Sequence, residues 1–222
     1  MLINELLKGF IKEAQTYYLP SNNTLWVSML IQCPYKFRLL REIPSLKALI
    51  QLQSNVLIGN LIHKGIEYYI AKFDIGIGER YVRIEKNVDG NHYTITGRVD
   101  VVDNNYCYEI KTINTVINDY RIPLRPHIEQ LLFYLYMLNK EFNEGEKDYV
   151  FIKYSLGYLV YIDLGKYTIK EIEVRFNDYA YNKVDEIIDD RIRNFVKMEK
   201  IPLYDGECNY CLFKSWCKYY KR

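Results

Sequence analysis

The stretch Gly97-Arg98-Val99-Asp100-Val101-Val102-Asp103-Asn104-Asn105-Tyr106-Cys107-Tyr108-Glu109-Ile110-Lys111 decides how the rest of this chain is interpreted. It predicts two strands joined by a two-residue turn, because Asn104-Asn105 tolerates the positive φ angles that a tight hairpin turn requires. This turn places Asp100 directly opposite Glu109 on the neighbouring strand. Lys111 lies two residues beyond Glu109, so it points to the same face of its strand.

The hairpin therefore carries two carboxylates and one ammonium on a single face. Directly opposed residues have Cβ atoms only ~4.5–5.5 Å apart, and like charges placed there repel each other. A divalent cation between the carboxylates removes that repulsion, and hard ions such as magnesium and manganese prefer oxygen ligands. A solvated hairpin face on which the lysine neutralises one acid explains the same residues equally well. The hairpin alone leaves both interpretations open.

Further strands are expected on both sides of this hairpin. Residues 80–97 alternate between apolar and polar side chains around an Asp89-Gly90 turn, so three or four antiparallel strands form a meander. Residues 148–164 predict another hairpin that turns near Gly157, and residues 168–176 predict one more strand.

Helices are expected between and after these strands. Their amphipathic patterns cover residues 1–19, 35–42, 55–73, about 126–142 and about 178–199. A short helix capped by Ser28 should end before Pro34. No repeat, low-complexity segment or linker divides the sequence. We therefore expect a single α+β domain over residues 1–222, with a mixed, mostly antiparallel central sheet flanked by helices.

Two of these helices carry residues that a purely structural helix does not need. Gly59 and His63 are one turn apart, and a glycine inside a helix costs roughly 1 kcal/mol. The glycine predicts close approach by another backbone or a ligand. A histidine on an apolar helix is usually a core residue, but beside this glycine it is also a candidate ligand. The helix that follows Pro126 carries one stripe made of His127, Gln130, Leu131 and Tyr134. Two polar side chains and a tyrosine on this stripe indicate that part of it faces a site.

The composition is that of a folded protein of 222 residues, with 49% hydrophobic and 26% charged residues and a formal net charge of +2. This charge provides no whole-molecule attraction to nucleic acid, so binding would depend on local basic patches, best developed in the C-terminal third. The 23 tyrosines can pack in the core or stack on bases. Neither a signal peptide nor an apolar run of the ~20 residues that span a membrane is visible, so we expect a cytoplasmic protein.

The five cysteines of an intracellular protein are more often ligands or free thiols than disulfides. Cys208 and Cys211 form a C-x-x-C motif, and Cys217 follows shortly after it. A four-thiolate site needs one more cysteine. Cys33, on a bend after a helix, is better placed for this than Cys107 in the central strand. Thiolate quartets hold zinc or an iron–sulfur cluster, and the spacing alone does not separate the two.

Taken together, these motifs resemble RecB-type nucleases of the PD-(D/E)xK superfamily. The matching elements follow in order along the chain: Gly59-x-x-x-His63, Gly97-Arg98-Val99-Asp100, Glu109-Ile110-Lys111 and Gln130-x-x-x-Tyr134. Two further segments resemble its iron–sulfur branch: Ser28-x-Leu30-x-x-Cys33-Pro34-x-x-Phe37 and the cluster of Cys208, Cys211 and Cys217. The small size, without a helicase domain, is similar to the CRISPR-associated RecB-like exonucleases, the fourth of the numbered CRISPR-associated families.

The resemblance implies a role for each of these residues. A catalytic magnesium or manganese ion would be bound by four groups: His63, Asp100, Glu109 and the backbone carbonyl of Ile110. Lys111 would orient or deprotonate the attacking water, and Gln130 and Tyr134 would position Lys111 or the DNA strand. A four-iron four-sulfur cluster would be held in a lobe made of residues 25–45 and 201–222 by four thiolates: Cys33, Cys208, Cys211 and Cys217.

The function that this resemblance implies is metal-dependent hydrolysis of single-stranded DNA by an exonuclease, in CRISPR spacer acquisition. Two other functions fit the same sequence. One is a general DNA repair or viral recombination nuclease with the same chemistry, and the other is a non-catalytic DNA-binding assembly subunit that kept the fold. The implied partners are DNA, preferably single-stranded, CRISPR integrase proteins and further copies of the chain, but no membrane.

Overall fold

The structure of this chain is a computed structural model that describes residues 8–9, 12, 23–46, 50, 53–114, 122–144 and 150–220. The helix expected over residues 1–19 therefore lies almost entirely outside the described residues.

Six strands form one sheet in the described part of the chain. They are β1 (Thr24–Trp26), β2 (Ile77–Val88), β3 (Asn91–Val102), β4 (Tyr106–Ile113), β5 (Leu156–Asp163) and β6 (Thr168–Arg175). β1, β3, β4, β5 and β6 are neighbours in that order, and β2 also pairs with β3. The β1–β3 and β4–β5 pairs are parallel and the other three pairs are antiparallel. The expected mixed, mostly antiparallel sheet is thereby confirmed.

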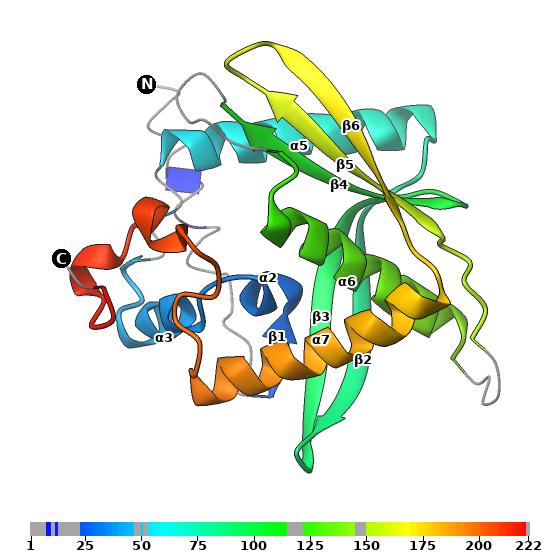
Figure 1. Ribbon diagram of the computed structural model, residues 1–222. Helices are drawn as coiled ribbons and strands as arrows, with labels where there is room; N and C mark the ends of the chain where they lie inside the picture. The colour runs from blue at the N-terminus through cyan, green and yellow to red at the C-terminus, as the bar shows by residue number, and fades with distance from the viewer. Residues whose placement is uncertain are drawn as a thin grey trace.

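The central hairpin has the register that its two-residue turn predicts. Val101 pairs with Tyr108, so Asp100 comes opposite Glu109. Beyond this point the two strands part, because β3 stays paired with β2 along its length while β4 pairs with β5. Figure 1 shows the result as a forked sheet, in which β2 and β3 run one way and β4, β5 and β6 another. The two carboxylates lie where the fork opens.

Helices cover both faces of β4 and β5. Ile66 and Ile70 of α5 (Ser54–Phe73) pack with Ile110 of β4. Alternate residues of a strand point to opposite faces, so Glu109 and Lys111 face the other way, toward α6 (Arg125–Phe142). α7 (Asp178–Lys197) packs along α6, and two short helices, α2 (Val27–Leu30) and α3 (Pro34–Glu42), follow β1 (Figure 1).

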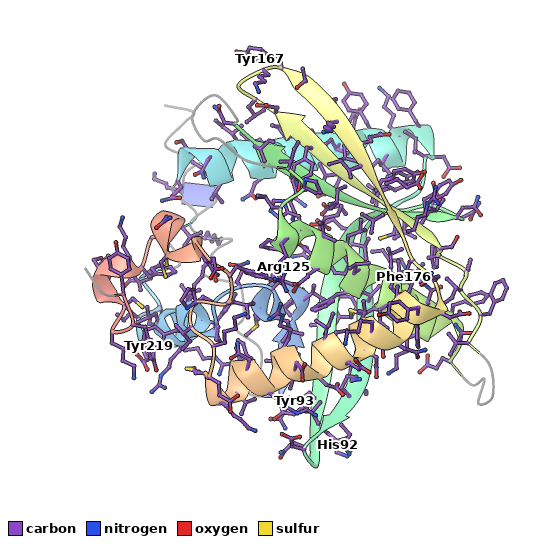
Figure 2. All side chains as sticks on the ribbon, viewed as in Figure 1. His92, Tyr93, Arg125, Tyr167, Phe176 and Tyr219 are labelled. Atoms are coloured by element: carbon purple, nitrogen blue, oxygen red, sulfur yellow. The ribbon has the colours of Figure 1, made fainter. Side chains whose placement is uncertain are left out.

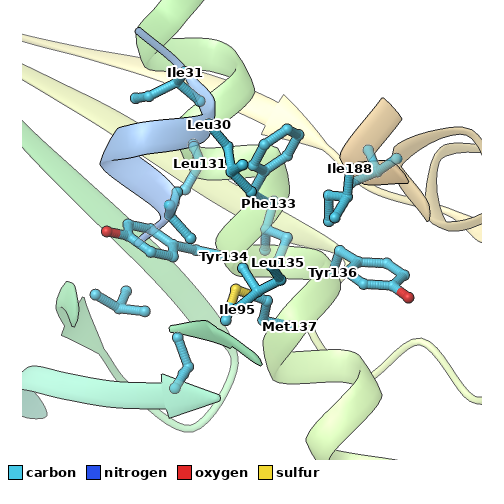
Figure 3. Close-up of a cluster of buried hydrophobic side chains, with 14 of the residues drawn as sticks. Leu30, Ile31, Ile95, Leu131, Phe133, Tyr134, Leu135, Tyr136, Met137 and Ile188 are labelled. Atoms are coloured by element: carbon cyan, nitrogen blue, oxygen red, sulfur yellow. The ribbon is translucent and has the colours of Figure 1, made fainter. Parts of the chain in front are cut away.

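The main hydrophobic core surrounds the middle of α6 (Figure 3). Leu30 of α2, Ile95 of β3 and Ile188 of α7 belong to this core, which shows that α6 is enclosed by three other elements. In Figure 3 the side chains of Tyr134 and Tyr136 point to opposite sides of α6. Tyr134 packs against β3, whereas the Tyr136 hydroxyl donates a hydrogen bond to a carboxylate of α7. The core therefore fixes the side of α6 that faces the sheet fork.

The hairpin expected over residues 148–164 is wrong. Residues 150–155 are not in a strand, and β5 continues without a turn through Gly157 and pairs with β6. This glycine serves packing, because a Cβ there would lie 3.0 Å from the side chains of Leu131 and Leu135 of α6.

The segment before Cys33 also differs from expectation. Ser28 does not cap a helix: α2 begins directly after β1, and its N-cap is Trp26. Pro34 is the first residue of α3, where its fixed φ and missing N–H suit a helix start. β1 has three residues, which are too few for an alternating strand pattern to appear in a sequence.

A smaller second core joins α3 to the C-terminal segment. Its buried residues are Tyr35, Leu39, Leu40, Leu46 and Phe213. The C-terminal segment contains two single-turn helices, η1 (Glu207–Tyr210) and η2 (Lys214–Trp216). The apolar side chains of residues 25–31 pack in the main core instead. None of the helices in the described ranges is long and apolar enough to cross a membrane.

Candidate active site

Glu109 lies at the mouth of the sheet fork with 1% of its surface exposed. Its Oε1 accepts a hydrogen bond from Lys111 Nζ at 2.5 Å. The other carboxylate oxygen, Oε2, is buried and has no hydrogen-bond partner among the described residues. A buried polar atom left without a partner costs roughly 1–3 kcal/mol, and more when it is charged. This oxygen therefore marks a position that a cation or a donor would stabilise.

Asp100 of β3 connects the two arms of the fork. Its Oδ2 accepts a hydrogen bond from the backbone N–H of Ile110 at 2.7 Å, across the gap where the two strands part. Its Oδ1 lies 3.6 Å from Nδ1 of His63, which comes from α5 on the other side of the sheet. Strand β3, strand β4 and helix α5 thus meet at one carboxylate.

The charges at the fork shift one another's pKa. Burial and the Asp100 carboxylate raise the pKa of Glu109 to about 8, while Lys111 acts in the opposite direction. Asp100 also raises the pKa of His63, against the effect of burial. Burial alone would lower the pKa of Lys111, but Glu109 and Asp100 outweigh it and raise this pKa. Two carboxylates that repel each other in a buried position favour the binding of a cation.

A chain of hydrogen bonds from α6 fixes the direction of the lysine. Gln130 Oε1 accepts from Lys111 Nζ at 2.9 Å, and Gln130 Nε2 donates to the Tyr134 hydroxyl at 3.2 Å. Gly97 of β3 leaves room for this chain, because a Cβ there would lie 2.6 Å from Cε1 of Tyr134. The glycine that precedes Asp100 in the motif is thus required by the packing of Tyr134.

The glycine on α5 has a similar role. A Cβ at Gly59 would lie 3.0 Å from Thr112 Oγ1 of β4. The close approach expected at this position is therefore made by a side chain of the sheet. It brings α5 near enough to β4 for His63, one turn further on, to reach Asp100.

Two residues without an assigned role also lie beside Lys111. Tyr161 of β5 is the register partner of Lys111, and its hydroxyl lies 2.9 Å from Nδ1 of His127 in the first turn of α6. The same hydroxyl accepts a hydrogen bond from the backbone N–H of Leu124 at 3.0 Å. Burial, and to a smaller extent Lys111, lower the pKa of His127 to about 3. His127 stood on the predicted α6 stripe, whereas Tyr161 carried no signal because its strand was assigned to the wrong hairpin.

The fork thus brings together six of the predicted site residues: His63, Asp100, Glu109, Lys111, Gln130 and Tyr134. Ile110 takes part through its backbone N–H, and the role expected for its carbonyl stays a prediction. Within the described ranges, no three His, Cys, Asp or Glu side chains are arranged so that they could hold a metal ion. The metal-ligand set therefore also stays a prediction.

The four predicted thiolate ligands lie around a different pocket, at the second core: Cys33, Cys208, Cys211 and Cys217. Lys36 and Lys214 line the same pocket. Burial raises the pKa of Cys33 to about 11. Glu207 Oε1 accepts a hydrogen bond from the backbone N–H of Cys33 at 2.6 Å, which ties the start of α3 to η1. Cys107 is fully buried in the main core, as expected.

Glu129 connects the active-site helix to the C-terminal segment. Its Oε2 accepts hydrogen bonds from Arg191 of α7 at 2.6 Å and from the Tyr204 hydroxyl at 2.7 Å. Its Oε1 accepts from Arg125 at 2.9 Å. Figure 2 shows Arg125 near the start of α6, and its guanidinium lies 5.6 Å from the centre of the Tyr204 ring.

The geometry at the fork defines a class of enzyme. Two opposed carboxylates, one of which has a buried oxygen without a partner among the described residues, lie next to an oriented ammonium. This arrangement provides what hydrolysis of a phosphodiester requires: a cation site and a group that directs water. The fold and the site therefore define a nuclease. The family model of the PD-(D/E)XK nuclease superfamily matches residues 68–218, and the chain belongs to this superfamily. Nucleases of this superfamily use divalent metal ions.

Several individual proteins are similar to this chain in sequence or in structure. The CRISPR-associated exonuclease Cas4 of Saccharolobus solfataricus is 26% identical over 221 residues, which cover 98% of each chain. The crystal structure of SSO0001 superposes with a TM-score of 0.82 at 25% identity and covers 100% of this chain and 98% of that one. The alkaline exonuclease LHK-Exo of Laribacter hongkongensis has a TM-score of 0.47 at 10% identity over 86% of this chain and 93% of that one.

Proposed function

We propose that this protein is a metal-dependent exonuclease that hydrolyses phosphodiester bonds of single-stranded DNA. The observation that carries the proposal is the buried, unpartnered Oε2 of Glu109 opposite Asp100. An isolated structural ion pair between Glu109 and Lys111 would leave this oxygen paired or exposed. A site that binds a cation during its reaction leaves it vacant for that ion.

The groups present suit a hard divalent cation. Asp100 Oδ1 and Glu109 Oε2 are the carboxylate oxygens that a magnesium or manganese ion would bind, with His63 as a nitrogen ligand. When bound, such an ion lowers the pKa of a coordinated water and neutralises charge on the phosphate.

The remaining residues act on the water and the strand. Lys111 holds its ammonium between Glu109 and Gln130, where it would orient the attacking water and offset the charge that develops on the phosphate oxygens. Gln130 and Tyr134 keep this ammonium in place, so their contribution is positioning.

The similarity to the CRISPR-associated exonuclease Cas4 over nearly the whole chain supports a role in CRISPR spacer acquisition, with integrase proteins and further copies of the chain as partners. A general repair or viral recombination nuclease is the competing assignment. A CRISPR array or integrase gene beside the coding sequence supports spacer acquisition, and a recombination operon supports the alternative.

We further propose that Cys33, Cys208, Cys211 and Cys217 hold a four-iron four-sulfur cluster. The support is that the thiol of Cys33, near the start of the chain, and the three thiols near its end line one pocket. With residues 25–45 and 201–222 this site would form the lobe expected from the sequence.

The nuclease proposal is tested with single-stranded and blunt double-stranded DNA labelled at either end. We expect magnesium- or manganese-dependent release of nucleotides from the single strand, slower cleavage of the duplex and no cleavage in chelator. Glu109→Gln should abolish cleavage and keep DNA binding. Its melting temperature should change little, because relief of repulsion from Asp100 and loss of the Lys111 ion pair act in opposite directions. Full activity in chelator, or in Glu109→Gln, would refute the mechanism.

A further inference from the structure

His127 is placed by two contacts in the first turn of α6. Its Nδ1 lies 2.9 Å from the hydroxyl of Tyr161, and that hydroxyl already accepts a hydrogen bond from the backbone N–H of Leu124. Tyr161 is 1% exposed. An unpaired hydroxyl proton in such a buried position would be costly, so the Tyr161 hydroxyl donates to Nδ1.

This direction of donation fixes the tautomer of the imidazole. When Nδ1 accepts a hydrogen bond, the proton of a neutral histidine resides on Nε2. Burial keeps the ring neutral, since it lowers the pKa of His127 to about 3. The described residues supply no hydrogen-bond partner for Nε2, and this nitrogen is not among the buried unpartnered atoms. His127 therefore presents an N–H donor that is open to a ligand and carries no charge.

The donor lies on the active-site side of α6. His127 precedes Gln130 by one turn on the stripe that faces the fork, and Tyr161 is the register partner of Lys111. At the start of an 18-residue helix, the helix dipole also favours an anion. The anion that a nuclease brings to this position is a phosphate of its substrate.

We propose that His127, held by Tyr161 as the neutral Nε2–H tautomer, donates a hydrogen bond to a phosphate oxygen of the DNA strand next to the scissile phosphate. This inference rests on the proposed nuclease function and adds a substrate-binding residue to it. A neutral donor holds the phosphate without the counterion release that a lysine or arginine would cause. It directs one phosphate and adds nothing to non-specific attraction.

The test compares His127→Phe, which keeps a ring against Tyr161, with His127→Gln, whose amide can accept from Tyr161 and donate to the strand. For His127→Phe we expect KM for a single-stranded oligonucleotide to rise about tenfold, as for loss of one hydrogen bond to a charged acceptor, with kcat nearly unchanged. His127→Gln should restore most of the loss. The slope of log Kd against log salt should equal that of the wild type, measured in calcium to prevent cleavage.

A set of oligonucleotides with one methylphosphonate each then locates the contact. One substitution next to the scissile bond should weaken binding to the wild type about tenfold and to His127→Phe hardly at all. Equal losses for both proteins at every position, an unchanged KM in His127→Phe, no rescue by His127→Gln, or a changed salt slope would each overturn the inference. Failure of the wild type to cleave any DNA would instead refute the proposed function, so the two failures are distinguishable.

Discussion

Lys111 is the residue on which the chemistry of the fork depends most directly, because its ammonium contacts both Glu109 and Gln130. It has two separable effects. Its positive charge partly neutralises the carboxylates, which weakens the binding of a divalent cation. Its N–H groups also point toward the site where water would attack. Its pKa is raised by Glu109 and Asp100 in spite of burial, so the group is charged at neutral pH and does not act as a free base.

Lys111→Met should separate these effects. We expect loss of cleavage, because methionine keeps the length of the side chain but has no N–H to direct water. We expect manganese binding to be as tight as in the wild type or tighter, because the ammonium no longer competes for the carboxylates. Calorimetric titration with manganese and a nuclease assay measure the two quantities.

Lys64→Met is the matched control for this variant. Lys64 lies next to His63 but is exposed and forms an ion pair with Glu67 of the same helix, so both activity and manganese affinity should stay at wild-type values. Manganese binding that disappears in Lys111→Met would assign the lysine to the binding site and contradict its role as the group that directs water.

At the scale of elements, the two glycines of α5 have opposite surroundings. Gly59 faces Thr112 of β4 at a distance that leaves little room for a Cβ, whereas nothing lies within 4 Å of a Cβ built at Gly65. Gly65→Ala should raise the free energy of unfolding by about 0.5–1 kcal/mol through helix propensity alone. Gly59→Ala should gain less or lose stability, and it should lower kcat because α5 carries His63 away from Asp100. Urea unfolding and kinetics on both variants test this contrast; equal behaviour would contradict it.

Glu129 makes the contact between α6, α7 and the C-terminal segment dependent on pH. Burial alone would raise the pKa of Glu129, but hydrogen bonds from Tyr204, Arg191 and Arg125 outweigh it and hold the pKa below its ordinary value. A carboxylate with a lowered folded-state pKa stabilises the fold above its unfolded pKa of about 4.3, and this stability is lost as the pH falls through the folded pKa.

The expected result for Glu129→Gln follows from the lowered pKa of Glu129 in the folded state. At pH 7 the variant should be less stable than the wild type by about 1–3 kcal/mol, and the difference should shrink below pH 4. Chemical unfolding at several pH values measures this, with Glu186→Gln as a control, since Glu186 pairs only with exposed Lys183 on α7. A difference that stays constant down to pH 3 would show that charge at Glu129 is not involved.

The elements also show which parts of the fold the sequence predicts. The long amphipathic helices and the β2–β3 and β3–β4 hairpins follow from local periodicity and turn residues, and so do the opposed carboxylates. Gly157 gives a false turn signal, because a glycine required by the packing of Leu131 looks the same in sequence as a glycine in a turn. The pairing of β5 with β4, and hence the place of Tyr161 beside Lys111, depends on contacts between distant segments that no local pattern records.

For the molecule as a whole, the second core packs α3 against the residues after α7, and the four predicted cysteine ligands line the pocket beside it. A cluster bound by Cys33 and the three C-terminal cysteines would close a loop around nearly the entire chain. Such a link acts mainly on stability, because it restricts the unfolded state.

Cys208→Ala and Cys33→Ala should therefore lose iron, visible absorbance and soluble yield, and melt at a lower temperature when prepared without oxygen. Cys107→Ala should keep its iron, because Cys107 is buried in the main core. Metal analysis and thermal unfolding of the three variants decide this. Zinc in place of iron, or loss of iron in Cys107→Ala alone, would contradict the proposed ligand set.

The second core also has a consequence for the order in which the protein is made. Every residue of the fork has been synthesised once Tyr161 has been added, but Phe213, which covers Leu39 and Leu40 of α3, comes roughly 50 residues later. At translation rates of about 5–20 residues per second, this interval lasts roughly 3–10 s. During that time each nascent chain already contains all the residues of the fork, while the apolar side chains of α3 are not yet covered by Phe213.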